Sequence, residues 1–253
     1  MFGHERRQTI VSRARRIGRV SVRELASDLH VTTETIRRDL KHLEQRGLIR
    51  RVHGGAVSVD NAALEPEVQE RSSTMVAEKK RIVRRAVDEL PSGGAVYIDA
   101  GTTTAAFADL LPADRHLTIV TNSLLVALSA TNLPNYRILL VGGEVRATTL
   151  ATVGSWTNRQ LEDITVDVAF IATNGVTVER GLTTPNNDEA AAKRQAIFAA
   201  TRVVLLADST KIGREYFERF CRLEDIDLFI TDTGADLSDL RQFHEAGINV
   251  VTV

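Results

Sequence analysis

The stretch TTETIRRDLKHLEQRG, residues 32–47, decides the fold of the first part of the chain. A helix advances about 100° per residue, so Ile36, Leu40 and Leu43 fall on one side, which must be buried. The opposite side is polar and mostly basic, with Glu34, Arg37, Arg38, Lys41 and Gln45. On an isolated helix, such a basic face most often only keeps the surface solvated. The neighbouring sequence has to decide between that interpretation and binding to a polyanion.

Two further helices are predicted before this stretch. Residues 5–18, ERRQTIVSRARRIG, have an amphipathic pattern that ends at Gly18. In residues 21–31, SVRELASDLHV, the spacing of Ser21 and Glu24 is that of a capping box, which marks the start of a helix. Either of the two threonines that open the quoted stretch can cap the third helix.

A β-hairpin is predicted directly after the third helix. Residues 47–59, GLIRRVHGGAVSV, contain two short β-prone runs around Gly54 and Gly55. Three helices followed by a hairpin form a winged helix-turn-helix, here over residues 1–57 with the helix-turn-helix itself at about 20–39. In that arrangement the third helix enters the major groove of DNA, and the wing lies near the phosphates.

Charge is unevenly distributed along the chain. Residues 1–57 hold 13 of the 32 Lys and Arg residues but only 6 of the 33 Asp and Glu residues, a net charge of +7, whereas the remainder has a net charge of −8. A basic head on an acidic body indicates that the head alone meets a polyanion. We therefore predict that the head binds double-stranded DNA in a sequence-specific manner. The predicted DNA contacts are Thr33, Glu34, Thr35, Arg37, Arg38 and Lys41 on the third helix and Arg50, Arg51 and His53 on the wing.

After residues 58–75, which lack sustained periodicity and are predicted to be a linker, β-prone runs alternate with helical patterns. The candidate strands are AVYIDA, LTIVTN, YRILLVG, DVAFIAT, VVLLADS, LFITD and NVVTV. Helical patterns lie at roughly 103–111, 123–130, 156–162, 187–200 and 236–245. Continuous apolar runs that alternate with helices predict a parallel sheet covered on both faces, and so a Rossmann-like α/β domain over residues 76–253.

Polar motifs follow four of these strands: DAGTTT, TNS, GGE and ADSTK. Gly101 permits a tight turn, and the threonines after it stand at a helix N-terminus, where amides and hydroxyls suit a phosphate. The glycines of GGE allow close approach of the backbone, Asn122 can contact sugar hydroxyls, and Lys211 can neutralise an anion. Each motif alone is more often a helix cap, a strand-to-helix turn or a solvated lysine. Because ligands of open α/β sheets bind at the carboxyl ends of strands, four such motifs together indicate a site.

Other features exclude further classes of protein. There is no P-loop and no G-x-G-x-x-G motif, so nucleotide binding is not indicated and no cofactor is predicted. The single cysteine, Cys221, rules out an internal disulfide, and the six histidines lack ligand spacing, so no metal site is predicted. The apolar runs are too short to span a bilayer, and the N-terminus lacks the apolar core of a signal peptide. We therefore expect a cytoplasmic protein without membrane contact.

Four remaining residues are interpreted as structural. Cys221 is expected to be a partly buried small residue, and Trp156 is expected to anchor a helix by packing. Glu189 and Lys193 could line the predicted site, but their i,i+4 spacing favours an ion pair on the surface of a helix.

The first part of the chain, with ELA, TIRRDL, LE..G and R.HGGA in one register, resembles the DNA-binding domain of DeoR-type transcriptional regulators. The motifs IDAGTTT, VTNS, VGGE, DVAFIATNGV, GLTTP and LLADSTKIG resemble the sensor domain of that family, in the family's order. The resemblance covers nearly the whole chain. It implies a sensor domain similar in fold to ribose-5-phosphate isomerase and coenzyme A transferases, and assembly into homodimers or homotetramers.

The resemblance also implies a function. We expect a repressor of an operon for carbohydrate catabolism or uptake, released by a phosphorylated sugar. By motif position, the implied effector contacts are Asp99, Gly101, Thr102, Thr103, Thr104, Thr121, Asn122, Gly142, Gly143 and Lys211. Two alternatives stay open. One is a sugar-phosphate isomerase-like enzyme, against which the attached DNA-binding head argues, and the other is an activator of the same class of genes.

Overall fold

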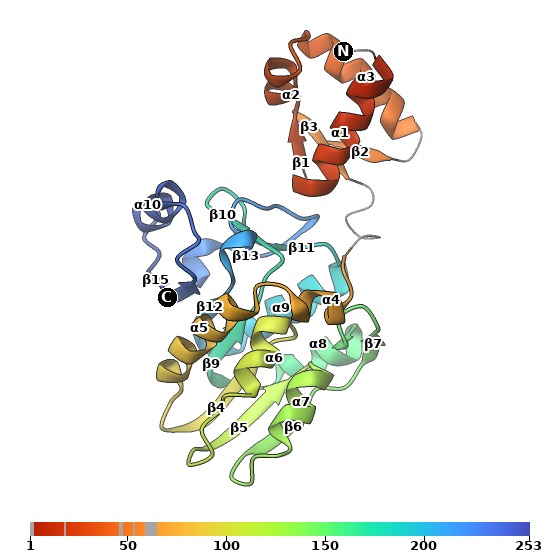
Figure 1. Ribbon diagram of the computed structural model, residues 1–253. Helices are drawn as coiled ribbons and strands as arrows, with labels where there is room; N and C mark the ends of the chain where they lie inside the picture. Colours follow the sequence, from red (N-terminus) through yellow and green to blue (C-terminus); the bar gives the residue numbers. More distant parts are fainter. Residues whose placement is uncertain (1–2, 18, 46–47, 53, 59–64) are drawn as a thin grey trace.

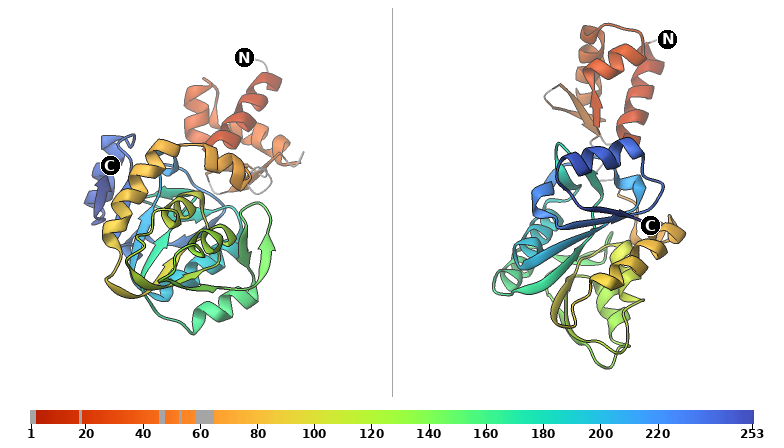
Figure 2. Two further views of the ribbon diagram at one scale, coloured as in Figure 1. Left: turned by 60° about the horizontal axis from the view of Figure 1, so that its bottom comes forward. Right: turned by 90° about the vertical axis from the view of Figure 1, so that its left-hand side faces the viewer.

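The computed structural model describes residues 3–17, 19–45, 48–52, 54–58 and 65–253. The chain folds into a small N-terminal unit and a larger α/β unit (Figure 1). Both views in Figure 2 show the small unit at one end of the molecule. Within the described ranges, no helix has the length and apolar character needed to cross a membrane.

The N-terminal unit is the predicted winged helix-turn-helix. Its elements are α1 (Gly3–Ile17), β1 (Arg19–Ser21), α2 (Val22–Asp28), α3 (Thr33–Gln45), β2 (Ile49–Val52) and β3 (Gly55–Ser58). The strands form an antiparallel sheet in the order β1-β3-β2, of which the sequence predicts only the β2–β3 hairpin. The predicted apolar stripe of α3 is confirmed, because Ile36, Leu40 and Leu43 are buried in one core with residues of α1, α2 and β2.

The starts of α2 and α3 differ in how they are capped. Thr32 Oγ1 accepts a hydrogen bond from the Thr35 N–H at 3.2 Å, which confirms a threonine cap for α3. The capping box predicted at Ser21 is wrong, because the Ser21 side chain makes no cap hydrogen bond. Ser21 instead ends β1 opposite Gly55, where a Cβ would lie 2.0 Å from the Val20 carbonyl oxygen. Glycine is therefore required there for the wing to close on β1.

A buried carboxylate ties α3 to α1. Asp39 lies on the inner side of α3 and accepts hydrogen bonds from Arg6 Nε at 2.6 Å and from Arg7 Nη1 at 3.4 Å. A buried charge is tolerated when it is paired. These two arginines therefore fix the position of α3, the helix that carries most of the predicted DNA contacts.

The larger unit is built on a seven-stranded parallel sheet in the order β15-β14-β12-β9-β4-β5-β6. Its strands are β4 (Gly93–Ile98), β5 (His116–Thr121), β6 (Arg137–Leu140), β9 (Val166–Ile171), β12 (Ala200–Leu206), β14 (Leu228–Thr231) and β15 (Val250–Thr252). All seven lie on the seven apolar runs identified in the sequence. The predicted parallel sheet is therefore confirmed.

Helices cover both faces of this sheet, as predicted (Figures 1 and 2). One face packs against α5 (Val76–Ala86), α6 (Thr102–Ala108) and α7 (Leu124–Ala130). The other face packs against α8 (Ser155–Glu162), α9 (Asn187–Phe198) and α10 (Leu237–Glu245). Side chains alternate along a strand. Val96 and Ile98 of β4 are therefore buried on the face covered by α5, α6 and α7, whereas Tyr97 is buried on the face covered by α8, α9 and α10.

Several short elements complete the larger unit. They are α4 (Val68–Ser73), the hairpin of β7 (Glu144–Arg146) and β8 (Ala151–Val153), the antiparallel sheet of β10 (Gly175–Thr177), β11 (Gly181–Thr184) and β13 (Glu218–Cys221), and one-turn 3₁₀ helices at Val87–Glu89, Ser209–Lys211 and Leu223–Asp225. The sequence does not predict these elements. The α4 helix lies within residues 58–75, which are predicted to be a linker.

The expectations for two single residues have different outcomes. Trp156 is 70% exposed, so the expectation that it anchors a helix by packing is wrong; α8 buries Thr157 and Leu161 instead. Cys221 is more fully buried than expected, and burial raises the pKa of its thiol to about 12. The Cys221 thiol is therefore protonated and unreactive at neutral pH.

The order of the strands reverses between β4 and β9. From β4 the chain proceeds outward through β5 and β6, and it then returns to β9 on the other side of β4 before continuing to β12, β14 and β15. In open α/β sheets, ligands bind beside the carboxyl ends of the strands at such a reversal. We call this position, between residues 99–104 after β4 and residues 172–174 after β9, the switch point.

Candidate DNA-binding face and effector site

The outer face of α3 presents most of the predicted DNA contacts to solvent. The exposed residues are Thr33, Glu34, Arg37, Arg38 and Lys41. Arg37 Nη1 lies 3.3 Å from Glu34 Oε2, an exposed pair that DNA phosphates can replace. Thr35 is half-buried, because its hydroxyl shares a 2.9 Å hydrogen bond with the Thr32 hydroxyl at the start of the helix.

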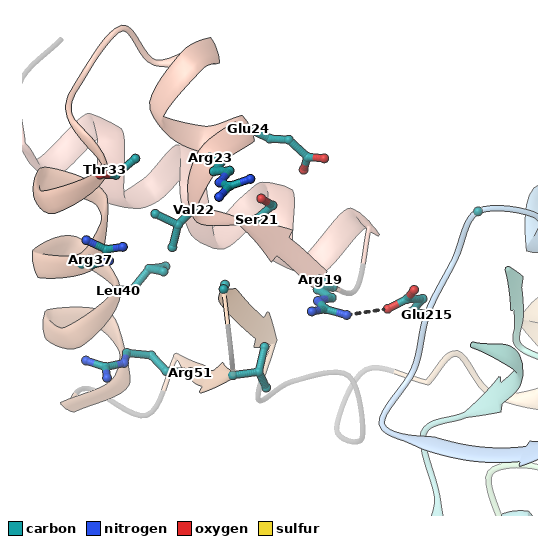
Figure 3. A pocket seen from close by; sticks show the side chains of 14 residues that line it. Arg19, Ser21, Val22, Arg23, Glu24, Thr33, Arg37, Leu40, Arg51 and Glu215 are labelled. Atoms are coloured by element: carbon teal, nitrogen blue, oxygen red, sulfur yellow. Dashed lines mark hydrogen bonds and ion pairs between the residues drawn. The ribbon is translucent and has the colours of Figure 1, made fainter. Parts of the chain in front are cut away.

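The wing adds one described side chain to this face. Arg51 of β2 is exposed, with Nε 3.6 Å from Glu44 Oε2 of α3, and its N–H donates to Glu44 Oε1 at 3.0 Å. Of the other predicted wing contacts, His53 and the side chain of Arg50 lie outside the described residues. Arg37 and Arg51 line the same open cavity of about 1420 Å³, so helix and wing share one basic surface (Figure 3).

The same cavity reaches the larger unit. Glu215, from the loop before β13, lines it and accepts a hydrogen bond from Arg19 Nη1 of β1 at 3.1 Å (Figure 3). Arg180 Nη1 lies 3.9 Å from the same carboxylate oxygen. This loop begins just after Lys211, so one segment connects a predicted effector contact with the DNA-binding unit.

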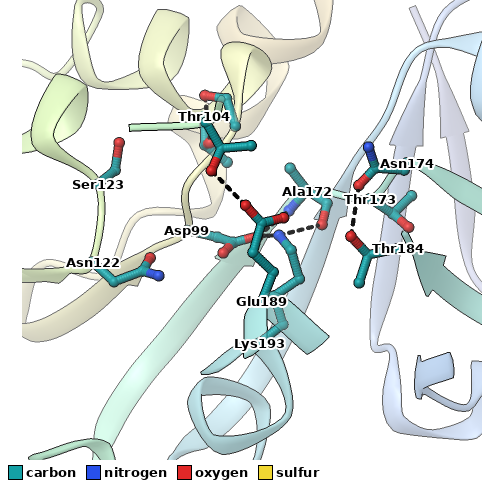
Figure 4. A network of polar contacts seen from close by, with 12 residues as sticks. Asp99, Thr104, Asn122, Ser123, Ala172, Thr173, Asn174, Thr184, Glu189 and Lys193 are labelled. Atoms are coloured by element: carbon teal, nitrogen blue, oxygen red, sulfur yellow. Dashed lines mark hydrogen bonds and ion pairs between the residues drawn. The ribbon is translucent and has the colours of Figure 1, made fainter. Parts of the chain in front are cut away.

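At the switch point, a carboxylate and an ammonium group are buried together. Asp99 Oδ2, directly after β4, accepts hydrogen bonds from the Ala172 N–H at 2.9 Å and from Lys193 Nζ, which also donates to the Ala172 carbonyl oxygen at 3.1 Å (Figure 4). Burial raises the pKa of the Asp99 carboxyl, while Lys193 and the hydrogen bonds act in the opposite direction. The Ala100 N–H also lowers the pKa of the Asp99 carboxyl, although Oδ1 is buried without a well-aligned hydrogen bond among the described residues.

Glu189 and Lys193 are not a surface pair, so that prediction is wrong. Both side chains are buried: Lys193 pairs with Asp99, while Glu189 accepts hydrogen bonds from Thr149 and, at 3.1 Å, from Arg146 Nη1. The reason is that α9 is buried on more than one side, with three of its alanines in the interior beside both charges. Alanines around the helix, in place of a single apolar stripe, are the signal that could have revealed this.

A second polar cluster lies next to the first. The buried carboxylate of Glu65 accepts hydrogen bonds from Arg146 Nη1 at 2.6 Å and from Asn174 Nδ2 at 3.1 Å. Arg71 Nη1 is 3.5 Å from the same carboxylate. Burial opposes the charge of Arg146, but Glu189 and Glu65 outweigh it and raise the pKa of Arg146. Arg146 therefore joins the two glutamates, and the hydrogen bond from Asn174 connects Glu65 to the switch point.

Lys211, predicted to neutralise an anion, lies in the one-turn helix after β12. Burial lowers the pKa of its ammonium group, and the nearby Asp208 acts in the opposite direction. Lys79 of α5 is buried too, which lowers its pKa to about 8, and it donates hydrogen bonds to the carbonyl oxygens of Arg71 (2.6 Å) and Thr74 (2.9 Å). Three cationic groups, on Arg71, Lys79 and Lys211, are therefore close enough to act on one another, with the carboxylates of Asp208 and Glu65 nearby.

The DAGTTT loop is closely packed. Gly101 has an extended backbone, and a Cβ there would lie 2.7 Å from the Ala172 Cβ, so glycine is needed for packing of the two strand ends and not for the predicted tight turn. Thr103 and Thr104 are buried, and the Thr104 hydroxyl donates to the Gly101 carbonyl oxygen at 3.0 Å. Thr102, at the start of α6, is the partly exposed threonine of the three.

The predicted contacts after β5 are engaged by the protein itself. The Asn122 amide accepts a hydrogen bond from the Tyr97 hydroxyl at 2.8 Å and donates to the Thr152 carbonyl oxygen at 2.9 Å. The Thr121 hydroxyl donates to the Ile98 carbonyl oxygen at 2.6 Å. These side chains hold the ends of β4, β5 and β8 together beside the switch point.

The two glycines after β6 pack against α8. Gln160 Oε1 accepts the Gly142 N–H at 3.1 Å, and the Thr157 hydroxyl donates to the Gly142 carbonyl oxygen at 2.9 Å. A Cβ at Gly143, whose φ is +154°, would lie 2.1 Å from Thr157 Oγ1. Close packing therefore explains why glycine stands here, and a role as ligand contact stays a prediction.

Two family models match the chain. The DeoR-like helix-turn-helix domain matches residues 6–62, and the DeoR C terminal sensor domain matches residues 74–233. The chain is 41% identical over 251 residues to the HTH-type transcriptional regulator GlpR of Haloferax volcanii, which covers 99% of this chain and 98% of that protein. It is 34% identical over 240 residues to the lactose phosphotransferase system repressor of Staphylococcus epidermidis, with 92% and 94% covered.

Among solved structures, ribose 5-phosphate isomerase A from Neisseria gonorrhoeae matches 53% of this chain and 52% of its own, at 14% identity and a TM-score of 0.40. So distant a likeness carries no argument about this chain. The full-length relatives, in contrast, are named as regulators of transcription and not as enzymes. With both units matched in order, the chain belongs to the DeoR family of DNA-binding transcriptional regulators.

Proposed function

We propose that this regulator represses an operon for carbohydrate catabolism or uptake and leaves its operator when a phosphorylated sugar binds at the switch point. The observation that carries the proposal is the buried Asp99–Lys193 pair, in which Asp99 Oδ1 has no well-aligned hydrogen bond among the described residues. A carboxylate oxygen accepts hydrogen bonds from sugar hydroxyls. The cationic groups of Arg71, Lys79 and Lys211 supply the charge that a phosphate needs.

The name of the Staphylococcus epidermidis relative supports both repression and a carbohydrate connection. The proposed DNA contacts are the exposed residues of the basic surface, with the two wing residues kept from the sequence: Thr33, Glu34, Arg37, Arg38, Lys41, Arg50, Arg51 and His53. The proposed effector contacts are Asp99, Thr102 and Lys211 from the sequence, joined by Lys193 from the structure. The remaining sequence-predicted residues are proposed to shape the site through packing.

The test is a titration of the operator complex with a panel of sugar phosphates. For wild type, an effector is expected to weaken operator binding by roughly 5–150-fold, a coupling of about 1–3 kcal/mol. Lys211→Ala is expected to bind the operator normally but to ignore the effector. The double variant Asp99→Asn with Lys193→Met, which removes both charges of the buried pair, is expected to do the same. Arg84→Ala, which changes an exposed arginine of α5, serves as the control and should respond like wild type.

Two outcomes would contradict the proposal. If both variants release the operator as readily as wild type, the effector site is elsewhere. If no sugar phosphate changes operator affinity, the proposed class of effector is wrong. Transcript levels in a deletion strain separate repression from activation, since loss of a repressor raises them and loss of an activator lowers them.

We also propose that the regulator forms a homodimer, or a tetramer built from such dimers, through the β6 edge of the sheet. Leu139 and Leu140 of this edge strand are 39% and 44% exposed, and Leu128 of the neighbouring α7 is 70% exposed. An edge strand with exposed apolar side chains favours pairing with another chain. Two heads held in this way suit the half-site spacing of helix-turn-helix operators.

Leu140→Glu is expected to convert the oligomer to monomers, because it places a charge on the proposed interface. Size-exclusion chromatography with light scattering measures the mass of the variant in solution. The operator affinity of the variant should be lower than that of wild type. Leu237→Glu is the matched control, since Leu237 is 81% exposed on α10, away from β6. An unchanged mass for Leu140→Glu would place the interface elsewhere.

A further inference from the structure

Glu65 is an anion that the chain itself places among the cationic groups of the sensor domain. It lies three residues before α4, the first helix of the larger unit. Its side chain is only 2% exposed. Arg146 at 2.6 Å and Asn174 at 3.1 Å donate hydrogen bonds to its two carboxylate oxygens. No feature of the sequence around Glu65 predicts this burial.

The cationic groups around Glu65 have donor capacity that one carboxylate does not use. Arg71 Nη1 is 3.5 Å from Glu65, while Arg71 Nε and Nη2 are buried without a partner among the described residues. Lys211 is close enough for Glu65 to act on its charge. A phosphate carries about −1.5 to −2 charge and three acceptor oxygens. It can therefore accept hydrogen bonds from the donors of two guanidinium groups, whereas a single carboxylate leaves some of those donors without a partner.

We propose that the Glu65 carboxylate occupies the phosphate position of the effector site, and that the phosphate group of the effector displaces it from Arg71 and Arg146. This inference rests on the proposed sensing of a phosphorylated sugar, and it adds the place of the phosphate and the way its binding reaches the DNA-binding unit. Glu65 and the effector phosphate are then mutually exclusive ligands of the same guanidinium groups. By linkage, whatever favours docked Glu65 weakens phosphate binding to the same extent.

Displacement of Glu65 changes the length of chain that holds each DNA-binding unit. With Glu65 docked, six residues separate it from Ser58 at the end of β3, and the seven Cα–Cα steps reach at most about 25 Å. The next anchor is Val68, whose buried N–H donates to the Thr148 carbonyl oxygen at 3.0 Å. Nine residues then separate Ser58 from Val68, and the ten Cα–Cα steps reach at most about 36 Å. When the connecting chain is longer, the two DNA-binding units of a dimer spend less time at the distance that matches the two half-sites of the operator. The operator affinity of the dimer therefore falls.

The first test measures binding of inorganic phosphate to the full-length protein by calorimetry. Glu65→Gln keeps the shape of the side chain but removes the competing charge, so it is expected to bind phosphate at least about tenfold more tightly than wild type, a gain of about 1.4 kcal/mol. Glu67→Gln changes an exposed glutamate two residues further on and should match wild type. Equal phosphate affinities for Glu65→Gln and wild type would overturn the proposal.

The second test needs no variant. A glutamate-specific protease is expected to cleave wild type after Glu67 faster when phosphate is added than with sodium chloride at the same ionic strength, because displaced Glu65 frees the chain up to Val68. Cleavage after Glu245, at the end of α10, reports any general effect of the salts on the protease. An unchanged or slower cleavage after Glu67 in phosphate would overturn the proposal.

Failure of the proposed function looks different from failure of this inference. If no sugar phosphate affects operator binding, the operator titration shows it, whatever the phosphate affinities of Glu65→Gln and wild type. If a sugar phosphate releases the operator but Glu65→Gln and wild type bind phosphate equally well, the proposed function is supported and the proposed role of Glu65 is wrong.

Discussion

Operator affinity of the wild-type protein is expected to fall by about a thousandfold or more as salt rises from about 50 to about 200 mM. Each DNA phosphate neutralised by Lys or Arg releases counterions, and roughly six to ten such contacts give a loss of this size. Each head exposes four cations on one surface, Arg37, Arg38, Lys41 and Arg51, so a dimer carries enough of them. The measurement is the operator Kd by fluorescence anisotropy over a salt series, plotted on logarithmic axes.

Arg38→Ala should reduce the slope of that plot by about one unit for each phosphate contact it removes. It should leave thermal stabilisation by the effector intact, since Arg38 is far from the switch point in the fold. Arg84→Ala, which removes an exposed arginine of α5, is the control of equal charge and should leave the slope unchanged. A nearly flat salt plot for wild type would refute the phosphate contacts. If Arg38→Ala lost both operator binding and thermal stabilisation by the effector, the variant would be misfolded.

Lys193→Met is expected to lower the free energy of unfolding by about 3–5 kcal/mol, because it leaves the Asp99 charge buried without its partner. The side chains of both residues are at most 5% exposed, so solvent cannot replace the lost interaction. Urea unfolding at neutral pH measures the change. Lys80→Met, at an exposed position of α5, should stay within about 0.5 kcal/mol of wild type.

The double variant Asp99→Asn with Lys193→Met separates lost charge pairing from lost packing. Removing both charges of a buried pair is often nearly neutral, so the double variant should recover much of the stability that Lys193→Met loses. The amide that replaces the Asp99 carboxylate can still accept a hydrogen bond from the Ala172 N–H. If Lys193→Met unfolds at the same urea concentration as wild type, the Asp99 charge does not depend on Lys193 for its burial.

The strands of the sheet could be predicted because each is a local pattern. The first five residues of VVLLADS are all apolar, and a short, continuous, β-branched run of this kind between helical patterns is typical of a strand covered on both faces. The rule that ligands bind at strand ends then points to Lys211 after β12 and to the DAGTTT motif after β4, whereas Asp99 itself is implied by the resemblance to the family. Both inferences need only residues that are close in sequence.

The rest of the candidate site depends on contacts between distant residues. Glu65 bonds to Arg146 and Asn174, which are 81 and 109 residues away in sequence, and no spacing rule connects them. The Lys193–Asp99 pair spans 94 residues in the same way. A charged residue becomes buried only when the tertiary fold brings it a partner, so its local sequence looks like that of any surface residue.

Inward and outward positions alternate along α3 within a few residues. Ile36, Asp39 and Leu40 face inward and hold the helix in the fold, whereas Arg37 and Arg38 between them face outward. Substitutions at exposed positions usually change stability by less than about 0.5 kcal/mol. A duplicated copy of this gene could therefore evolve towards a new operator through outward positions alone, without an unstable intermediate and with its effector response unchanged.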